Sequence, residues 1–243
     1  MITQAIINIL TILANTIQPT IGDYFTEKNY RRNYEILRQL TFVFFCISSV
    51  VAAGLFSLIT LFICDIWLSP AYELGWGTAV LCIVVLLIKI MGLPLSLMMG
   101  VTGLFEKEKN AGASSAVLNL VVSLALVRPY GMTGVLLGTL LSYLLQICYR
   151  YVIFFRDFLE MKEEAIRYAR DLGEYTTVMI LEVAVTRRII PLIYGNGGMT
   201  PFISCFVLCI LVPLALNGVF FGRGWRLQSI VKMVRGMKRS GSR

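Results

Sequence analysis

Long apolar segments alternate with short polar connections along the whole chain. Residues 40–64 contain no Asp, Glu, Lys or Arg, and residues 78–105 contain a single one, Lys89. A helix that spans a bilayer needs about 20 apolar residues, so both segments are long enough to cross. The pattern therefore predicts an all-α polytopic membrane protein with about seven transmembrane helices. The predicted spans are residues 2–21, 40–68, 78–105, 111–127, 132–155, 176–194 and 202–221.

The segment at 176–194 is the least apolar of these spans, because it contains Glu182, Arg187 and Arg188. Each charge near the centre of a span costs about 3 kcal/mol on insertion scales. The basic segments before and after the last two spans favour the same side of the membrane, so these two spans either both cross or both stay out. Residues 202–221 form a good span, and we therefore expect 176–194 to cross as well.

The distribution of Lys and Arg predicts the orientation of the chain. The first, third and fifth connections are basic (27–39, 106–110 and 156–175), and so is the C-terminal tail, whereas the connection at 65–77 has two acids and no base. Basic segments stay on the cytoplasmic side of a membrane. The odd-numbered connections and the C-terminus are thus predicted to be cytoplasmic, and the first helix enters from outside.

Two of the basic segments are also amphipathic. Apolar residues within 156–175 fall on one side of a helix, which predicts a helix lying along the membrane surface. The tail mixes Trp, Leu, Ile and Val with bases, a pattern that favours contact with anionic lipid headgroups. The predicted organisation is a transmembrane bundle at 1–155, a cytoplasmic interfacial helix at 156–175, two additional spans at 176–222 and a basic cytoplasmic tail at 223–243.

The composition agrees with a membrane protein and offers few residues for catalysis or metal binding. The chain is 57% hydrophobic, whereas soluble domains are about 45–50% apolar. The net charge is +8, and the basic residues lie between and after the apolar segments. We therefore attribute them to membrane topology rather than to binding of nucleic acid. The six cysteines form no C-x-x-C motif, and histidine is absent. We therefore expect no metal site, no cofactor and no enzymatic activity.

The first span carries an unusual stripe of polar side chains. Gln4, Asn8, Thr11, Asn15 and Gln18 recur at steps of four, three, four and three, which places all five on one face of a helix. Helix packing explains one or two amides in lipid, but a water-filled cavity explains the whole stripe more simply. These five residues are therefore predicted to line a substrate cavity.

Three residues on later spans join this prediction. Lys89 lies deep within the third span, where a lysine either pairs with an acid or faces a polar cavity. Asn119 and Gln146 are amides within the fourth and fifth spans, and we assign them to the same cavity.

Small residues on the fifth span predict close helix packing. Gly134, Gly138 and Ser142 follow each other at steps of four. A small-x-x-x-small series lets two helix backbones approach closely in a membrane.

An ordered series of motifs carries a family resemblance. G-L-F at 103–105 precedes a short charged loop, N-L-x-x-S-x-x-L-V follows at 119–127, and Gly131 precedes G-V-x-L-G-T-x-x-S at 134–142. This series resembles the Wzx-like polysaccharide flippases of the MOP (MATE-like) exporter superfamily. The resemblance covers most of the chain and is strongest over residues 21–155.

The resemblance implies a fold and a function. Members have two bundles of six helices, often with two helices added, and this chain looks like helices 8–14, without the N-terminal bundle. Met1 would then be an internal methionine of a longer protein. The implied activity is the flipping of an undecaprenyl-diphosphate-linked oligosaccharide across the bacterial plasma membrane, for lipopolysaccharide or exopolysaccharide biosynthesis. Amides suit sugar hydroxyls, and Lys89 could attract the diphosphate.

Two alternatives stay open. Many relatives carry further bases near residues 92–100, where this sequence has none, which weakens a charge-driven mechanism. A drug/cation antiporter of the same superfamily would use an intramembrane carboxylate, and Glu182 is the one deep candidate. The chain could also be an inactive truncated fragment, since half of a rocking transporter cannot alternate access alone.

Overall fold

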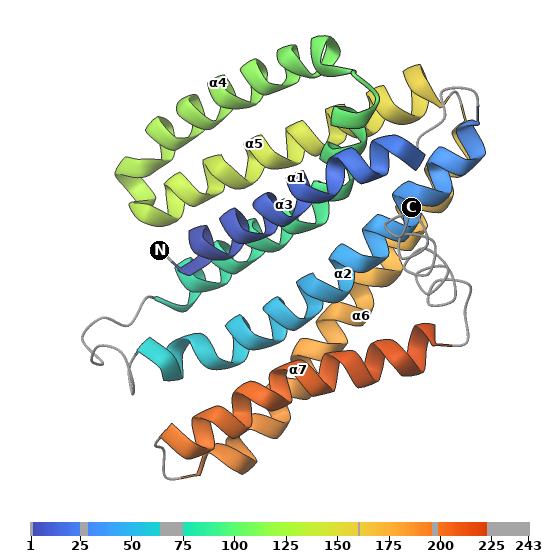
Figure 1. Cartoon of the computed structure of the whole chain (residues 1–243). Coiled ribbons are helices and arrows are strands. Elements are labelled where there is room, and N and C mark those ends of the chain that lie inside the picture. The colour runs from blue at the N-terminus through green and yellow to red at the C-terminus, as the bar shows by residue number, and fades with distance from the viewer. Residues whose placement is uncertain (1, 25–28, 64–74, 160, 196–198, 223–243) are drawn as a thin grey trace. The chain divides into compact units, whose positions relative to one another are not determined.

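The chain folds into helices (Figure 1). The computed structural model describes residues 2–24, 29–63, 75–159, 161–195 and 199–222, and within these ranges it has seven α-helices and no strand. The π-helical segment η3 (Ile153–Phe158) directly continues α5. The α-helices are α1 (Ile2–Tyr24), α2 (Tyr30–Leu61), α3 (Trp76–Val101), α4 (Phe105–Tyr130), α5 (Met132–Val152), α6 (Lys162–Tyr194) and α7 (Met199–Phe221).

Most of these helices suit a lipid environment. Among the described residues, six helices are long and apolar enough to cross a membrane, namely α1 to α5 and α7. Large apolar side chains such as Leu120 and Leu124 on α4 are exposed, which favours contact with lipid rather than water. The prediction of an all-α polytopic membrane protein is confirmed.

Helix α6 differs from the expected pattern. It runs unbroken from Lys162 to Tyr194, where the sequence suggested a surface helix at 156–175 and a separate span at 176–194. At 33 residues it is long enough to cross a membrane, but it is not among the helices that are apolar enough to do so. No proline interrupts the chain near residue 175, and Gly173 alone costs a helix only about 1 kcal/mol. Helix α6 therefore continues through residue 175. The predicted basic tail at 223–243 lies outside the described residues.

The chain forms two compact units. Unit 1 comprises residues 1–37 and 74–171, and unit 2 comprises residues 38–73 and 172–243. Helices α1, α3, α4 and α5 belong to unit 1, and α7 belongs to unit 2. Helices α2 and α6 begin in unit 1 and continue into unit 2. The two units are thus interleaved in sequence.

Glycines bring α4 and α5 together in unit 1. Gly131 joins the two helices at φ 55°, a backbone conformation that glycine adopts readily. A Cβ added at Gly134 would overlap the carbonyl group of Leu126, and one added at Gly138 would overlap Ser123. Helix α5 also packs against α3, and α3 against α1. This order places α1, α3 and α5 around a common space.

The helix ends that border the three basic connections share one end of unit 1. The ring of Tyr30, at the start of α2, lies 5.9 Å from that of Phe158 after α5. Glu108 near the start of α4 pairs with Arg150 near the end of α5. Figure 1 shows the ends of α1 and α5 and the starts of α2 and α4 on the same side. This arrangement agrees with the alternating charge of the connections.

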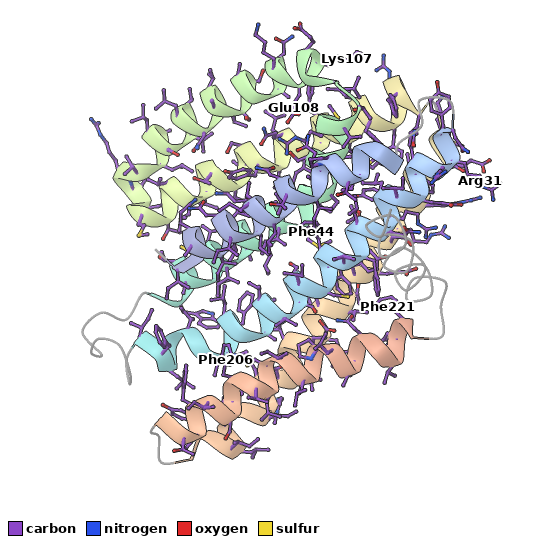
Figure 2. The ribbon with its side chains drawn as sticks, in the orientation of Figure 1. Arg31, Phe44, Lys107, Glu108, Phe206 and Phe221 are labelled. Carbon is purple, nitrogen blue, oxygen red and sulfur yellow. The ribbon has the colours of Figure 1, made fainter. Side chains whose placement is uncertain are left out.

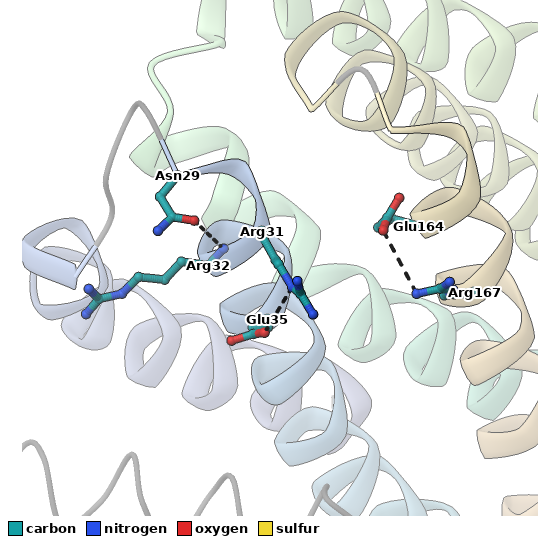
Figure 3. A network of polar contacts seen from close by, with 6 residues as sticks. All are labelled: Asn29, Arg31, Arg32, Glu35, Glu164 and Arg167. Atoms are coloured by element: carbon teal, nitrogen blue, oxygen red, sulfur yellow. Dashed lines mark hydrogen bonds and ion pairs between the residues drawn. The ribbon is translucent and has the colours of Figure 1, made fainter.

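Local polar contacts stabilise the starts of α2 and α6 (Figure 3). The Asn29 side-chain oxygen accepts a hydrogen bond from the Arg32 backbone N–H at 3.1 Å, which satisfies one unpaired donor at the start of α2. Glu164 and Arg167 form an ion pair at 4.0 Å within the first turns of α6. Both contacts lie in unit 1.

An aromatic cluster forms the core of unit 2. Phe45 of α2 stacks on Tyr175 of α6 with ring centres 4.6 Å apart, and Phe221 of α7 contacts both rings edge-on. Phe42 completes the cluster. Figure 2 shows Phe221 near the end of α7. A second cluster of buried side chains packs the same three helices and consists of Leu58, Ile190, Tyr194, Cys205 and Cys209.

Candidate functional site: a polar cavity in unit 1

A cavity of about 300 Å³ lies between α1, α3 and α5 within unit 1. We call it the polar cavity, because amides, hydroxyls and two basic side chains contribute to its wall. Membrane-embedded helices rarely expose such groups without a partner. The residues lining it are Gln4, Ile7, Asn8, Thr11, Lys89, Gly92, Leu93, Ser96, Tyr143, Gln146, Ile147 and Arg150.

Helix α1 supplies two amides and one hydroxyl. The Gln4 amide nitrogen donates a hydrogen bond to the Asn8 side-chain oxygen at 2.8 Å. This bond leaves the Gln4 oxygen and the Asn8 nitrogen with capacity for a ligand, because neither atom takes part in it. The Thr11 hydroxyl donates to the Ile7 carbonyl at 2.7 Å and can still accept a hydrogen bond. The α1 wall can therefore donate and accept without carrying a charge.

Helix α3 supplies a cation that is held by an aromatic ring. The Lys89 ammonium lies 4.4 Å from the centre of the Tyr143 ring on α5. A cation over an aromatic face is stabilised by about 0.5–2 kcal/mol, more when it is shielded from water. The contact thus lets the ammonium remain at the cavity wall without a carboxylate partner among the described residues.

Arg150 lines the cavity on α5, but its charge is balanced. Its Nε donates to a Glu108 carboxylate oxygen at 2.6 Å, and a second guanidinium nitrogen contacts the same oxygen. The side chains are only 15% and 19% exposed, which strengthens the pair relative to a surface one. Figure 2 labels Glu108 near the start of α4. Lys89 is therefore the main source of positive potential in the cavity.

The residues predicted for a substrate cavity fall into two groups. Asn15 is exposed further along α1, and Gln18 packs against α3, where it would overlap a Cβ added at Gly100. Asn119 accepts a hydrogen bond from Ser123 on its own helix at 3.0 Å. None of these three amides lines the polar cavity. The structure brings together the other five, which are Gln4, Asn8, Thr11, Lys89 and Gln146.

The predicted packing residues lie on the face of α5 that contacts α4. Gly134, Gly138 and Ser142 are all buried. The Ser142 hydroxyl donates a hydrogen bond to the backbone carbonyl of Thr139 on the same helix at 2.8 Å. These positions bring the helices together and stay outside the cavity wall.

Three polar residues of the cavity escaped the sequence analysis: Ser96, Tyr143 and Arg150. Their spacing could have revealed them. Tyr143, Gln146 and Arg150 follow at steps of three and four, and Ser96 lies seven residues after Lys89. Both patterns keep side chains on one helix face. The sequence analysis assigned Gln146 of α5 to the cavity but used the other polar and small positions of that helix, Gly134, Gly138 and Ser142, for packing.

No group of three or more His, Cys, Asp or Glu residues is arranged to hold a metal ion in the part of the chain that the structure describes. Comparison of the chain with protein-family models, curated proteins and solved structures gave no significant match. A functional assignment therefore depends on the chemistry of the polar cavity and on the motif series at 103–142.

Proposed function

We propose that this chain takes part in flipping a lipid-linked oligosaccharide across the bacterial plasma membrane, as the C-terminal bundle of a Wzx-like flippase. The polar cavity among membrane-spanning helices is the observation that supports this function best. A glycan that crosses a hydrocarbon layer must exchange its water for other hydrogen-bonding partners. The amides of Gln4, Asn8 and Gln146 can both donate to and accept from sugar hydroxyls.

Lys89 supplies a positive charge that can bind the linking diphosphate. A cation near a phosphate forms charge-assisted hydrogen bonds, which are about twice as strong as neutral ones. The Tyr143 ring holds the ammonium at the wall, so little side-chain entropy is lost when an anion binds. Arg150, already paired with Glu108, can orient a phosphate but adds less net charge.

The charge of the connections supports an orientation for this transporter. The first turns of α2, α4 and α6 lie in the basic connections, and basic segments favour the cytoplasm. We therefore propose that this end of unit 1 is cytoplasmic, as is the C-terminal tail. Arg150 then lies towards the cytoplasmic end of the cavity, and Gln4 lies towards the outer end.

Ligand binding tests the proposal on the chain itself. We would add an undecaprenyl-diphosphate oligosaccharide to the purified protein in detergent micelles and measure bound lipid by native mass spectrometry. Asn8→Leu removes an amide from the cavity, and Asn15→Leu removes an amide from the same helix outside it. We expect Asn8→Leu to weaken binding about tenfold, the equivalent of one to two lost hydrogen bonds. Asn15→Leu should bind like the wild type, and equal effects of the two substitutions would overturn the proposal.

Translocation is a second, separate measurement. A version of the protein with an N-terminal bundle should restore surface polysaccharide in a flippase-null strain, and Lys89→Gln should impair the restoration. Failure of the chain to bind any lipid-linked glycan would favour an inactive fragment instead.

The antiporter alternative makes the opposite prediction for the ligand. A cavity for organic cations would bind them more tightly after Lys89→Gln, because the substitution removes a like charge. Glu182, the carboxylate that such a transporter would use, is not among the residues of the polar cavity.

A further inference from the structure

Unit 2 contains a buried carboxylate whose presence the proposed function does not explain. Glu182 of α6 has 0% of its surface exposed. Neither of its carboxylate oxygens accepts a hydrogen bond of standard geometry from any described residue. Burial of a carboxylate without partners is among the most costly arrangements in a folded protein. A buried carboxyl group of this kind is retained where it has a function or where it is protonated and therefore neutral.

Polar groups of α2 lie next to this carboxylate, and one of them, Ser49, connects it to Asn217 of α7. The Ser49 hydroxyl of α2 lies next to the carboxylate but donates its proton elsewhere, and the Cys46 thiol of the same helix lies close enough to interact with the carboxylate electrostatically. The Asn217 amide nitrogen of α7 donates to the Ser49 hydroxyl at 3.0 Å, and that hydroxyl donates to the Cys46 carbonyl at 3.0 Å. The side-chain oxygen of Asn217 is also buried, and no described residue donates to it. Three buried acceptor oxygens in this cluster therefore lack a donor.

The described part of α2 after Arg38 and the described part of α7 supply no counter-charge to Glu182. Helix α7 contains no Asp, Glu, Lys or Arg, and neither does α2 after Arg38. On α6 itself, Arg187 and Arg188 are exposed. The titratable group that faces the carboxylate is the Cys46 thiol, which is neutral in its protonated form. An ionised Glu182 would therefore be an uncompensated charge.

We propose that Glu182, together with Ser49 and Asn217, forms a proton-binding site between α2, α6 and α7. A proton taken from water converts the carboxylate to a neutral carboxylic acid. Its new O–H supplies a donor to a cluster in which three buried oxygens lack one. Release of the proton restores the charge, and the three helices must then move apart or admit water to solvate it. Proton uptake thereby stabilises the packed arrangement of unit 2.

A metal cation fits the site less well. The cluster offers four side-chain oxygens, two from Glu182 and one each from Ser49 and Asn217, and the Ser49 oxygen already accepts a hydrogen bond. Hard cations take about six or more oxygen ligands. A proton needs one acceptor beyond the carboxylate, which the cluster contains.

This inference does not rest on the proposed function, because its residues belong to unit 2 and the polar cavity belongs to unit 1. A protein that fails to bind a glycan can still carry the proton site. Conversely, loss of the site leaves the glycan-binding measurement intact. The two proposals therefore fail separately.

Infrared difference spectroscopy tests the site directly. The purified protein in lipid nanodiscs should show the C=O stretch of a protonated carboxylic acid at neutral pH, and the band should disappear as the pH rises. Glu182→Gln should abolish this band, whereas Glu174→Gln, which removes an exposed acid from the same helix, should retain it. A band of unchanged intensity in Glu182→Gln would overturn the proposal, as would its absence from the wild type at neutral pH.

Two further measurements keep the proposal testable if Glu182→Gln does not fold. Ser49→Ala and Asn217→Leu each remove a polar neighbour, so at least one should shift the wild-type band. An unshifted band in both variants would overturn the assignment to this cluster. Exchange of choline for sodium at constant pH should leave the band unchanged, and its loss in sodium would identify a metal-cation site instead.

Discussion

The ammonium nitrogen of Lys89 lies 4.4 Å from the centre of the Tyr143 ring, and both side chains line the polar cavity of unit 1. Lys89 stands on α3 and Tyr143 on α5, more than fifty residues apart in the sequence. The contact holds a cation within a group of membrane-spanning helices, with no carboxylate partner in the described ranges of the chain. It also joins the only charge of the third predicted span to a wall of amides and hydroxyls.

Removal of the Tyr143 ring should weaken binding of a diphosphate-linked lipid. Tyr143→Leu loses the cation–π contact, worth about 0.5–1 kcal/mol, and frees the Lys89 ammonium to adopt other positions. We expect an affinity about three- to fivefold lower by native mass spectrometry. Tyr143→Phe keeps the ring and serves as the control, with an affinity near that of the wild type. Equal affinities of the two variants would contradict a role for the ring.

Access of water should differ between positions along α1. A cysteine at position 8 lines the polar cavity, so Asn8→Cys should react with a membrane-impermeant thiol reagent. Ile9→Cys and Asn15→Cys lie outside the cavity and should react more slowly. Site-specific mass spectrometry distinguishes these positions from the native cysteines. A rate for Asn8→Cys no faster than that for Ile9→Cys would argue against a water-filled cavity.

Enlarging Gly134 should destabilise the α4–α5 contact. The Cβ of Gly134→Ala would overlap the Leu126 carbonyl, and such overpacking costs about 1–3 kcal/mol. Gly112→Ala on α4 is the control, since nothing lies within 4 Å of its added Cβ. We expect that control to be neutral or slightly stabilising, because alanine favours a helix more than glycine does. Unfolding in a titration with SDS measures both, and similar stabilities would refute the close approach.

The Arg150–Glu108 pair should couple strongly in a double-mutant cycle. Both side chains are largely buried, so replacing one partner leaves a poorly solvated charge. We expect a coupling free energy of about 1–3 kcal/mol from SDS unfolding of Glu108→Ala, Arg150→Ala and the double variant. The Arg31–Glu35 pair in Figure 3, with side chains 86% and 61% exposed, should couple by less than about 0.5 kcal/mol. Comparable values for both pairs would contradict the prediction.

The helices themselves could be predicted from the sequence. The charge-free run at 40–64 leaves its backbone no water to bind in lipid, so it must satisfy its hydrogen bonds within a helix. The periodicity of Gln4, Asn8 and Thr11 identified one face of α1 correctly as a single stripe, because the 3.6-residue repeat depends only on local geometry. Gly134 and Gly138 likewise marked a helix surface that packs closely.

The extent of the cavity and the surroundings of each polar group were decided by tertiary structure. Asn8 and Asn15 occupy the same stripe of α1, but only Asn8 faces the cavity wall that α3 and α5 supply. Periodicity identifies a helix face and cannot tell how far its partners extend along it. Glu182 looked like an obstacle to membrane insertion, and its burial next to Ser49, which in turn contacts Asn217, became visible only once α2, α6 and α7 were packed together. Such contacts join residues more than a hundred positions apart, and local sequence patterns do not encode them.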